Sequence, residues 1–400
     1  MRSTQIIIAL IVMIACFACE DKTVYHDTME EPVKALDIEV SEYGMTALTD
    51  GSAATLIQTD NPHWQYDYNP ETDISDYVIA KIARNGNIQL SDTFSLLTQT
   101  QTKSVDNKIF TPITGDIFVY NKYHDDYSFD YDDNTPRILT KITHNGNKAY
   151  TRLLVREESC TALDNGDYAL FSNDTLRQYY NLNDNSNLFY VMDQSPLYLP
   201  RASAISFEDK IILYADNIFL MYHTDGTLVT NETFDSKASI YNVKYVKGYL
   251  YFVLQCGSIS TNSTNYPIYK YVVTKKDALS TQIHSDTIVA NFINDNIVVQ
   301  NDTLIVHGII QKNVEDNDFV GAIYFFDNED GHLIETITLD NDDSSIIPYI
   351  ISPDLNGEYD VYATKRNKYD SRNNTNNSNP YCGRLFIYHI DDLHKLKQNN

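Results

Sequence analysis

The chain lacks several features that would identify a function. It contains one Trp, and its 30 Lys and Arg residues are outnumbered by 55 Asp and Glu residues, which gives a formal net charge of −25 over 400 residues. A surface with this excess of negative charge repels phosphate backbones and anionic lipid headgroups. We therefore expect no nucleic-acid partner.

Cysteine is scarce. Beyond the N-terminal segment the chain contains only Cys160, Cys256 and Cys382. An odd number of widely spaced cysteines does not make the disulfide framework of a small exported domain. The chain also has no H-E-x-x-H, no G-x-S-x-G, no G-x-x-x-x-G-K and no dinucleotide fingerprint. We predict no metal site and no cofactor. An enzyme is not excluded, because paired glycosidase carboxylates converge from distant strands and leave no linear motif.

The N-terminus has the pattern of an export signal. An apolar run extends from Ile6 to Ala18, shorter than the roughly 20 residues that a membrane-spanning helix needs. The run ends in C-F-A-C-E-D-K, which resembles the lipobox of bacterial lipoproteins, in which a cysteine becomes the lipidated first residue. We assign Cys19 rather than Cys16, because an acidic pair follows it, as in surface lipoproteins of Bacteroidota. Residues 1–18 are then the signal peptide and residues 19–35 an acidic tether.

Two series of turns alternate along the rest of the chain. In the first series a turn precedes an apolar, β-rich run; its members lie at Gly51, Gly115, Gly166, Asp209, Gly248, Asp302 and Gly357. The second series contains Asn-Gly and Asp-Gly hairpin signals at Gly86, Gly146, Gly226 and Gly331, with weaker equivalents near Asn185, Asp277 and Asp392. Each turn joins two strands, so one turn of each series and the connection between them make a four-stranded antiparallel meander.

Meanders of this size expose two edges and an apolar face, so they gain stability by packing against one another. We therefore predict an all-β fold, a single β-propeller over residues 36–400 with four-stranded antiparallel blades. The turns predict seven blades, with six or eight as alternatives; one or two β-sandwiches are the competing architecture. We expect residues 36–42, which alternate in polarity, to complete the last blade as its outer strand, because the C-terminus offers no equivalent.

Few segments suggest binding chemistry. The segment H-W-Q-Y-D-Y-N-P contains Trp64, Tyr66 and Tyr68, whose aromatic planes beside polar groups suit stacking against sugar rings. Aromatic side chains that only cap the end of a blade would give the same pattern. The loop from His124 to Asn134 has the carboxylate density of a calcium site, but it does not match an EF-hand, and a solvated connection between strands explains it.

Asp-Thr followed by an aliphatic residue or Met occurs at Thr28, Thr175, Thr287 and Thr303. This short pattern resembles the O-glycosylation sequon of Bacteroidota. Because Asp-Thr before a strand is also ordinary turn chemistry, Thr28, in the expected tether, is the strongest of the four candidates.

The lipobox, the acidic tether and the repeated meander together resemble the propeller-like surface lipoproteins of unknown function in Bacteroidota. The resemblance implies a lipid anchor in the membrane, at the outer membrane or the cell surface. Our leading hypothesis is a non-catalytic module that binds a glycan, peptide or protein through one face of the ring or its channel. The alternatives are a glycan hydrolase or lyase with carboxylates around the channel, and a structural subunit of an envelope complex.

Overall fold

The computed structural model describes the strands and most of the short turns of the chain. The residues described are 23–25, 34–40, 45–48, 50–59, 74–97, 105–112, 114–123, 137–154, 159–163, 168–172, 175–179, 187–191, 203–246, 248–256, 264–266, 268–273, 279–284, 288–290, 292–293, 296–313, 318–339, 344–353, 359–367 and 383–390. The regular secondary structure within these ranges consists of β-strands alone. Accordingly, no helix within them is long and apolar enough to cross a membrane.

The described strands form seven sheets, which we number in chain order. Sheet 1 contains β3 (Met45–Ala47), β4 (Ala53–Gln58), β5 (Ile74–Ile82), β6 (Ile88–Leu90) and β7 (Phe94–Leu97). Sheet 2 contains β8 (Val105–Phe110), β9 (Ile117–Tyr123), β10 (Arg137–Ile142) and β11 (Lys148–Leu154). Sheet 3 contains β12 (Ser159–Ala162), β13 (Tyr168–Ser172), β14 (Thr175–Tyr179) and β15 (Asn187–Val191). Sheet 4 contains β16 (Ser203–Phe207), β17 (Lys210–Ala215), β18 (Ile218–His223) and β19 (Leu228–Thr233).

Of the last three sheets, sheets 5 and 6 have additional short strands. Sheet 5 contains β20 (Ala238–Val246), β21 (Tyr249–Cys256), β22 (Thr264–Tyr266), β23 (Ile268–Val273), β24 (Leu279–His284) and β25 (Ile288–Ala290). Sheet 6 contains β26 (Phe292–Ile293), β27 (Val298–Gln300), β28 (Thr303–Asn313), β29 (Asp318–Asp327), β30 (Leu333–Leu339) and β1 (Thr23–Tyr25). Sheet 7 contains β31 (Ser344–Pro353), β32 (Tyr359–Asn367), β33 (Gly383–Ile390) and β2 (Lys34–Val40).

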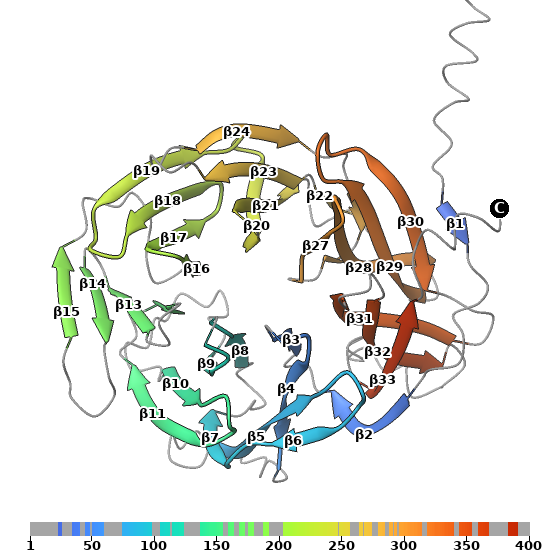
Figure 1. Ribbon diagram of the computed structural model, residues 1–400, viewed down its shortest axis with the longest axis horizontal. Coiled ribbons are helices and arrows are strands. Elements are labelled where there is room, and N and C mark those ends of the chain that lie inside the picture. The colour runs from blue at the N-terminus through green and yellow to red at the C-terminus, as the bar shows by residue number, and fades with distance from the viewer. Residues whose placement is uncertain are drawn as a thin grey trace, which may run out of the picture.

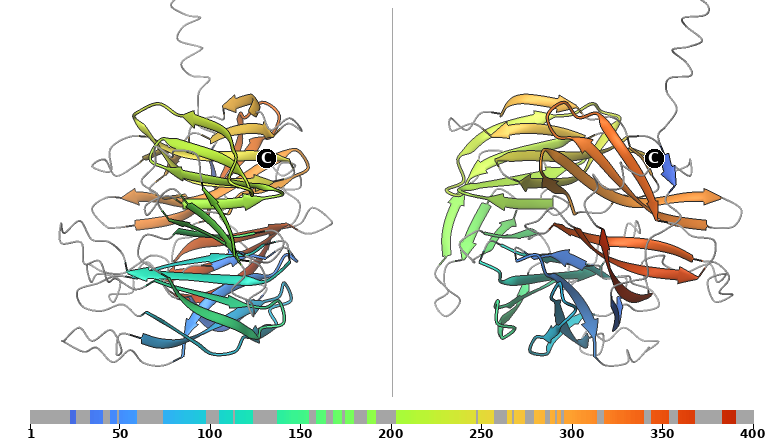
Figure 2. Two further views of the ribbon diagram at one scale, coloured as in Figure 1. Left: turned by 90° about the vertical axis from the view of Figure 1, so that its left-hand side faces the viewer. Right: turned by 45° about the vertical axis from the view of Figure 1, so that its right-hand side comes forward.

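The sheets are arranged around a central axis as a β-propeller, and their main strands pair antiparallel. Figure 1 shows β3, β16, β20 and β31 near the centre of the ring and β11, β15, β19, β24 and β30 near its rim. The side views in Figure 2 show the sheets following one another around this axis rather than forming two stacked layers. The predicted all-β propeller of four-stranded antiparallel sheets is therefore confirmed, and the sandwich alternative is wrong.

The two predicted series of turns occupy fixed places in the sheets. Described turns of the first series join the first strand of a sheet to the second, and those of the second series join the third to the fourth. Gly86 and Gly146, in the second series, adopt φ values of 75° and 87°, a conformation that glycine accepts without steric cost. Because alternate strands run in opposite directions, both series lie on one side of the ring, which we call the turn face. The connections between second and third strands leave from the other side, the connection face.

Apolar side chains fill the space between neighbouring sheets. The described buried residues form seven hydrophobic clusters, each containing residues of two consecutive sheets. One cluster joins sheet 7 to sheet 1, where Tyr349, Ile350 and Tyr362 pack with Ala80 and Ile82. The core is therefore a closed series of interfaces, and no sheet buries its faces alone.

The N-terminal part of the chain closes the ring. β2 pairs antiparallel with β33 as the outer strand of sheet 7, with Val40 opposite Gly383. The expected closing strand, residues 36–42, is thus present, displaced by two residues. Within the segment expected to be a tether, β1 adds a further strand outside β30, and it pairs in parallel.

Candidate functional site

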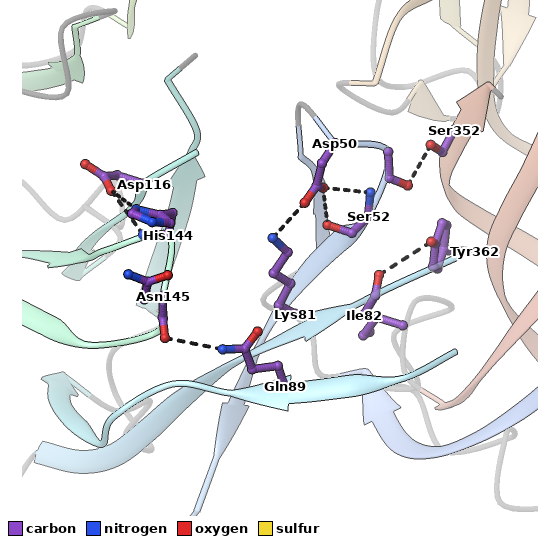
Figure 3. A network of polar contacts seen from close by, with 11 residues as sticks. Asp50, Ser52, Lys81, Ile82, Gln89, Asp116, His144, Asn145, Ser352 and Tyr362 are labelled. Atoms are coloured by element: carbon purple, nitrogen blue, oxygen red, sulfur yellow. Dashed lines mark hydrogen bonds and ion pairs between the residues drawn. The ribbon is translucent and has the colours of Figure 1, made fainter. Parts of the chain in front are cut away.

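The turn face of sheets 7, 1 and 2 contains a network of polar contacts (Figure 3). It begins at Asp50, in the turn between β3 and β4. The Gly51 amide donates to the Leu48 carbonyl at 3.1 Å and closes this turn. Asp50 Oδ1 accepts hydrogen bonds from the Ser52 hydroxyl and from the Ser52 amide, the latter at 3.0 Å. Its Oδ2 lies 2.7 Å from Nζ of Lys81, on the neighbouring strand β5.

These contacts keep the Asp50 carboxylate ionised. Partial burial alone would raise its pKa, but the hydrogen bonds from Lys81 and Ser52 outweigh burial and lower the pKa to about 2. A carboxylate of this kind holds no proton at neutral pH, so it is not suited to general acid catalysis. Because the Asp50 side chain is 53% exposed and that of Lys81 28%, we expect the ion pair to stabilise the fold by only about 1 kcal/mol or less.

Sheet 2 has a similar ion pair between an Asp in its first turn, between β8 and β9, and a Lys on its third strand. A carboxylate oxygen of Asp116 lies 2.9 Å from Nζ of Lys141, the penultimate residue of β10, as Lys81 is of β5. This pair is more deeply buried, with side-chain exposures of 13% and 10%. Asp116 also accepts a hydrogen bond from the His144 amide at 3.1 Å, and Nδ1 of His144 lies 3.9 Å from the same carboxylate.

The sequence contains a signal for this network in the repeated turn segments of sheets 1 and 2. The third strands of sheets 1 and 2 end in K-I-A-R-N-G-N and K-I-T-H-N-G-N, so the lysines occupy the same repeat position. Sheet 4 has Met221 there, and a different pair forms instead: Lys210 Nζ lies 2.7 Å from Asp209, with Nδ1 of His223 3.4 Å from the same carboxylate. The hydrogen bond from Lys210 is the main cause of a lowered pKa at Asp209.

Further contacts join sheet 1 to sheet 2 at the same face. Nε2 of Gln89, on β6, donates to the Asn145 carbonyl at 3.3 Å (Figure 3). The Asp92 amide donates to the Gly146 carbonyl at 2.8 Å, and its carboxylate accepts from the Lys148 amide at 2.9 Å. The outer edge of sheet 1 is thereby attached to the hairpin turn of sheet 2.

A third set of contacts joins sheet 1 to sheet 7, its other neighbour in the ring, where the ring closes. The guanidinium of Arg84 forms an ion pair with Asp360, whose side chain is completely buried. The Ser352 hydroxyl donates to the Gly51 carbonyl at 2.8 Å, and Oη of Tyr362 lies 3.5 Å from the Ile82 carbonyl (Figure 3). The network therefore fixes the turns of three consecutive sheets relative to one another.

A second group of polar side chains lies in the turn between β29 and β30 of sheet 6. Asp327, Asp330 and His332 each offer one ligand atom, and these atoms lie within 4.8 Å of one another. Oδ1 of Asp327 already accepts hydrogen bonds from the Glu329 and Asp330 amides at 2.7 and 3.1 Å, and Oδ1 of Asp330 accepts one from the His332 amide at 3.0 Å. The cluster is thus a hydrogen-bonded, largely exposed hairpin turn.

Most site residues predicted from the sequence lie outside the described residues. This applies to Cys19, Thr28, Trp64, Tyr66, Tyr68 and Thr287. Thr175 and Thr303 are the first residues of β14 and β28. Thr303 is half-buried and follows a hairpin turn in which Asn301 and Asp302 have φ values of 46° and 61°, as expected of ordinary turn chemistry.

Comparisons with known proteins give weak similarities. No family model matches the chain, and no curated protein matches it. A crystal structure of a protein of unknown function from Bacteroides caccae aligns with a TM-score of 0.40 and 11% identity, over 71% of this chain and 93% of the other. The WD40 domain of Pan2 from Neurospora crassa aligns with a TM-score of 0.46 and 7% identity, over 88% and 89%. The fold assignment therefore rests on the strand pairing and packing described above.

Proposed function

We propose that the chain is a lipid-anchored, non-catalytic binding module of the cell envelope, built as a propeller of seven blades with one blade per sheet. The blade count is supported by the seven hydrophobic clusters, because each lies between two consecutive sheets. The anchor at Cys19, in the outer membrane or at the cell surface, is supported by the lipobox pattern.

The contrast between the two faces supports a binding role. On the turn face of sheets 7, 1 and 2, the polar side chains of the network contact one another and hold the sheets together. The longer connections leave from the connection face, and two of them, residues 59–73 and 124–136, belong to consecutive sheets. Both contain several acids and aromatic residues and no Lys or Arg. We place the ligand site at these two connections.

The residue types favour a glycan as the ligand. Trp64, Tyr66 and Tyr68 offer aromatic planes for sugar rings, and neighbouring Asp and Asn side chains offer hydrogen-bond acceptors and donors for hydroxyl groups. A peptide or protein partner is the alternative occupant of the same face. The excess of carboxylates disfavours anionic ligands.

The single Trp provides a direct test, because Trp64 is the only Trp in the chain. We expect soluble oligosaccharides that bind to change the Trp64 fluorescence. The double variant Tyr66→Ala/Tyr68→Ala keeps this reporter and should weaken binding at least about tenfold, because stacking on each aromatic ring contributes on the order of 1 kcal/mol.

Ile88→Ala is the matched control, because it removes an exposed apolar side chain from β6, opposite Ile82 at the turn-face end of sheet 1 and away from these connections. Equal affinity of the double variant and the wild type would exclude the proposed ligand site. Release of new reducing ends from a bound oligosaccharide would instead identify a hydrolase.

A further inference from the structure

We propose that the rim of sheet 6 is the surface that faces the lipid bilayer, so that the ring is held by its edge and both faces stay open to partners. This inference rests on the proposed lipidation of Cys19 and adds the orientation of the ring. It follows from where the chain first pairs with the propeller.

The first contact of the chain with the ring is the strand β1. Thr23, Val24 and Tyr25 pair in parallel with Thr336, Ile337 and Thr338, in the middle of β30. β30 is the outer strand of sheet 6, so β1 lies at the rim, as Figure 1 shows. Sheet 6 is the one described sheet in which a further strand lies outside the regular fourth strand.

The outer strand β30 is more buried than the outer strands of other sheets, as expected where a further strand covers the rim. Glu335, Thr336 and Thr338 are all buried, although polar residues of an outer strand normally face solvent. The outer strands of other sheets differ, since all three residues of β6 are exposed, as are four of the seven residues of β11. Because Thr336 and Thr338 pair with β1, the N-terminal segment itself contributes to covering this edge of the propeller.

Covalent geometry then limits the distance between the anchor and the rim. Four residue steps separate Cys19 from Thr23, and a fully extended chain covers at most about 14 Å over that distance. The headgroup region on one side of a bilayer is about 6 Å thick. An acyl chain on Cys19 that enters the hydrocarbon region therefore brings the rim of sheet 6 close to the lipid headgroups.

The direction of β1 shows from which side the anchor approaches. β30 begins next to the turn at Gly331, on the turn face, and runs toward the connection face. Because β1 is parallel to β30, the residues before Thr23 come from the turn-face side of the rim. The connection face, with the proposed ligand site, then points away from the point of attachment.

The orientation can be measured by fluorescence quenching on vesicles. The acylated full chain would be reconstituted into phosphatidylethanolamine and phosphatidylglycerol vesicles that contain a lipid with a nitroxide on its headgroup. A fluorophore would be attached at Glu329→Cys, in the β29–β30 turn, or at Ala149→Cys, on β11, and both positions are exposed. The strands β30 and β11 lie on opposite sides of the ring (Figure 1). Cys256, which is partly exposed, and Cys382 would be replaced by Ser.

We expect quenching at position 329 to exceed that at position 149 by about threefold or more. The variant Val24→Pro/Tyr25→Pro should reduce this ratio toward one. Alternate amides of a strand point toward its partner, so one of two consecutive prolines must replace an amide that can donate to β30. Val24→Ala/Tyr25→Ala keeps both amides and should preserve the ratio.

Flotation of the vesicles separates failure of the orientation from failure of the anchor. Wild-type protein should float with the vesicles and Cys19→Ala should not. Equal quenching at both positions in protein that floats would overturn the orientation and leave the anchor intact. Wild-type protein that does not float would overturn the anchor, and the orientation with it.

Discussion

His307 makes the stability of this propeller sensitive to acid, and the size of the effect follows from its burial. It lies on β28 between sheets 6 and 7 and is completely buried. Burial lowers its pKa from 6.5 to about 3, against a smaller opposing effect of the nearby Pro348 backbone. The folded protein therefore keeps a neutral imidazole, whereas the unfolded chain takes up a proton below about pH 6.5.

Protonation of the unfolded chain pulls the equilibrium toward unfolding. The stability that depends on neutral His307 is fully present above pH 6.5 and is lost as the pH falls from 6.5 toward 3, by about 1.4 kcal/mol per pH unit. Between pH 7.5 and 5.0 the expected loss is about 2 kcal/mol. The assay is urea-induced unfolding of wild type and His307→Gln across this range. Other titrating groups contribute equally to both proteins, so their contributions cancel in the difference between the two free energies of unfolding.

The difference in free energy of unfolding between wild type and His307→Gln should change by about 2 kcal/mol from pH 7.5 to 5.0. His307→Asn is a second replacement without a titrating group, and the difference between wild type and this variant should change by the same amount. A difference for His307→Gln that stays constant over the range would refute the reasoning.

Two substitutions and one deletion test the packing between sheets. Gly321→Ala should destabilise the fold by at least about 2 kcal/mol, measured by urea unfolding, because the new methyl group would lie 2.2 Å from the Ile346 carbonyl oxygen; an unchanged midpoint would contradict this. Arg84→Ala should cost about 3 kcal/mol, since it leaves the Asp360 carboxylate buried, and adding Asp360→Asn should recover part of that loss. Deletion of residues 34–40 removes β2 and should lower Tm by on the order of 10 °C in calorimetry; an unaltered Tm would show that β2 does not close the ring.

Much of the fold was predictable because local turn chemistry repeats. Gly86 and Gly146 lie in Asn-Gly hairpins, and the left-handed backbone they adopt is encoded within a few residues. The closing strand was also predictable, because alternation in residues 36–42 is a local signal and the sequence after Asp392 shows no such alternation. The described strand, Lys34–Val40, starts two residues earlier.

The polar contacts between sheets were not predictable, because they depend on packing between distant segments. Arg84 and Asp360 meet only when the last sheet packs against the first. Arg137, Thr140 and Lys141 of β10 are residue types that normally face solvent, yet the whole strand is buried. Lys141 is accommodated by Asp116, and Arg137 donates to the hydroxyl of Tyr120 at 3.2 Å. The proposed binding residues remain predictions.

The pairing of β2 with β33 also constrains how the protein is made. A ribosome synthesises the chain from its N-terminus, so β2 is among the first strands to be made and its partner β33 is the last described strand to be made. Until translation ends, the edges of both terminal sheets stay open, and open edges invite pairing with other chains. A nonsense mutation anywhere before β33 would leave the early strand without its partner, so we expect prematurely terminated chains to aggregate or be degraded rather than persist as smaller rings.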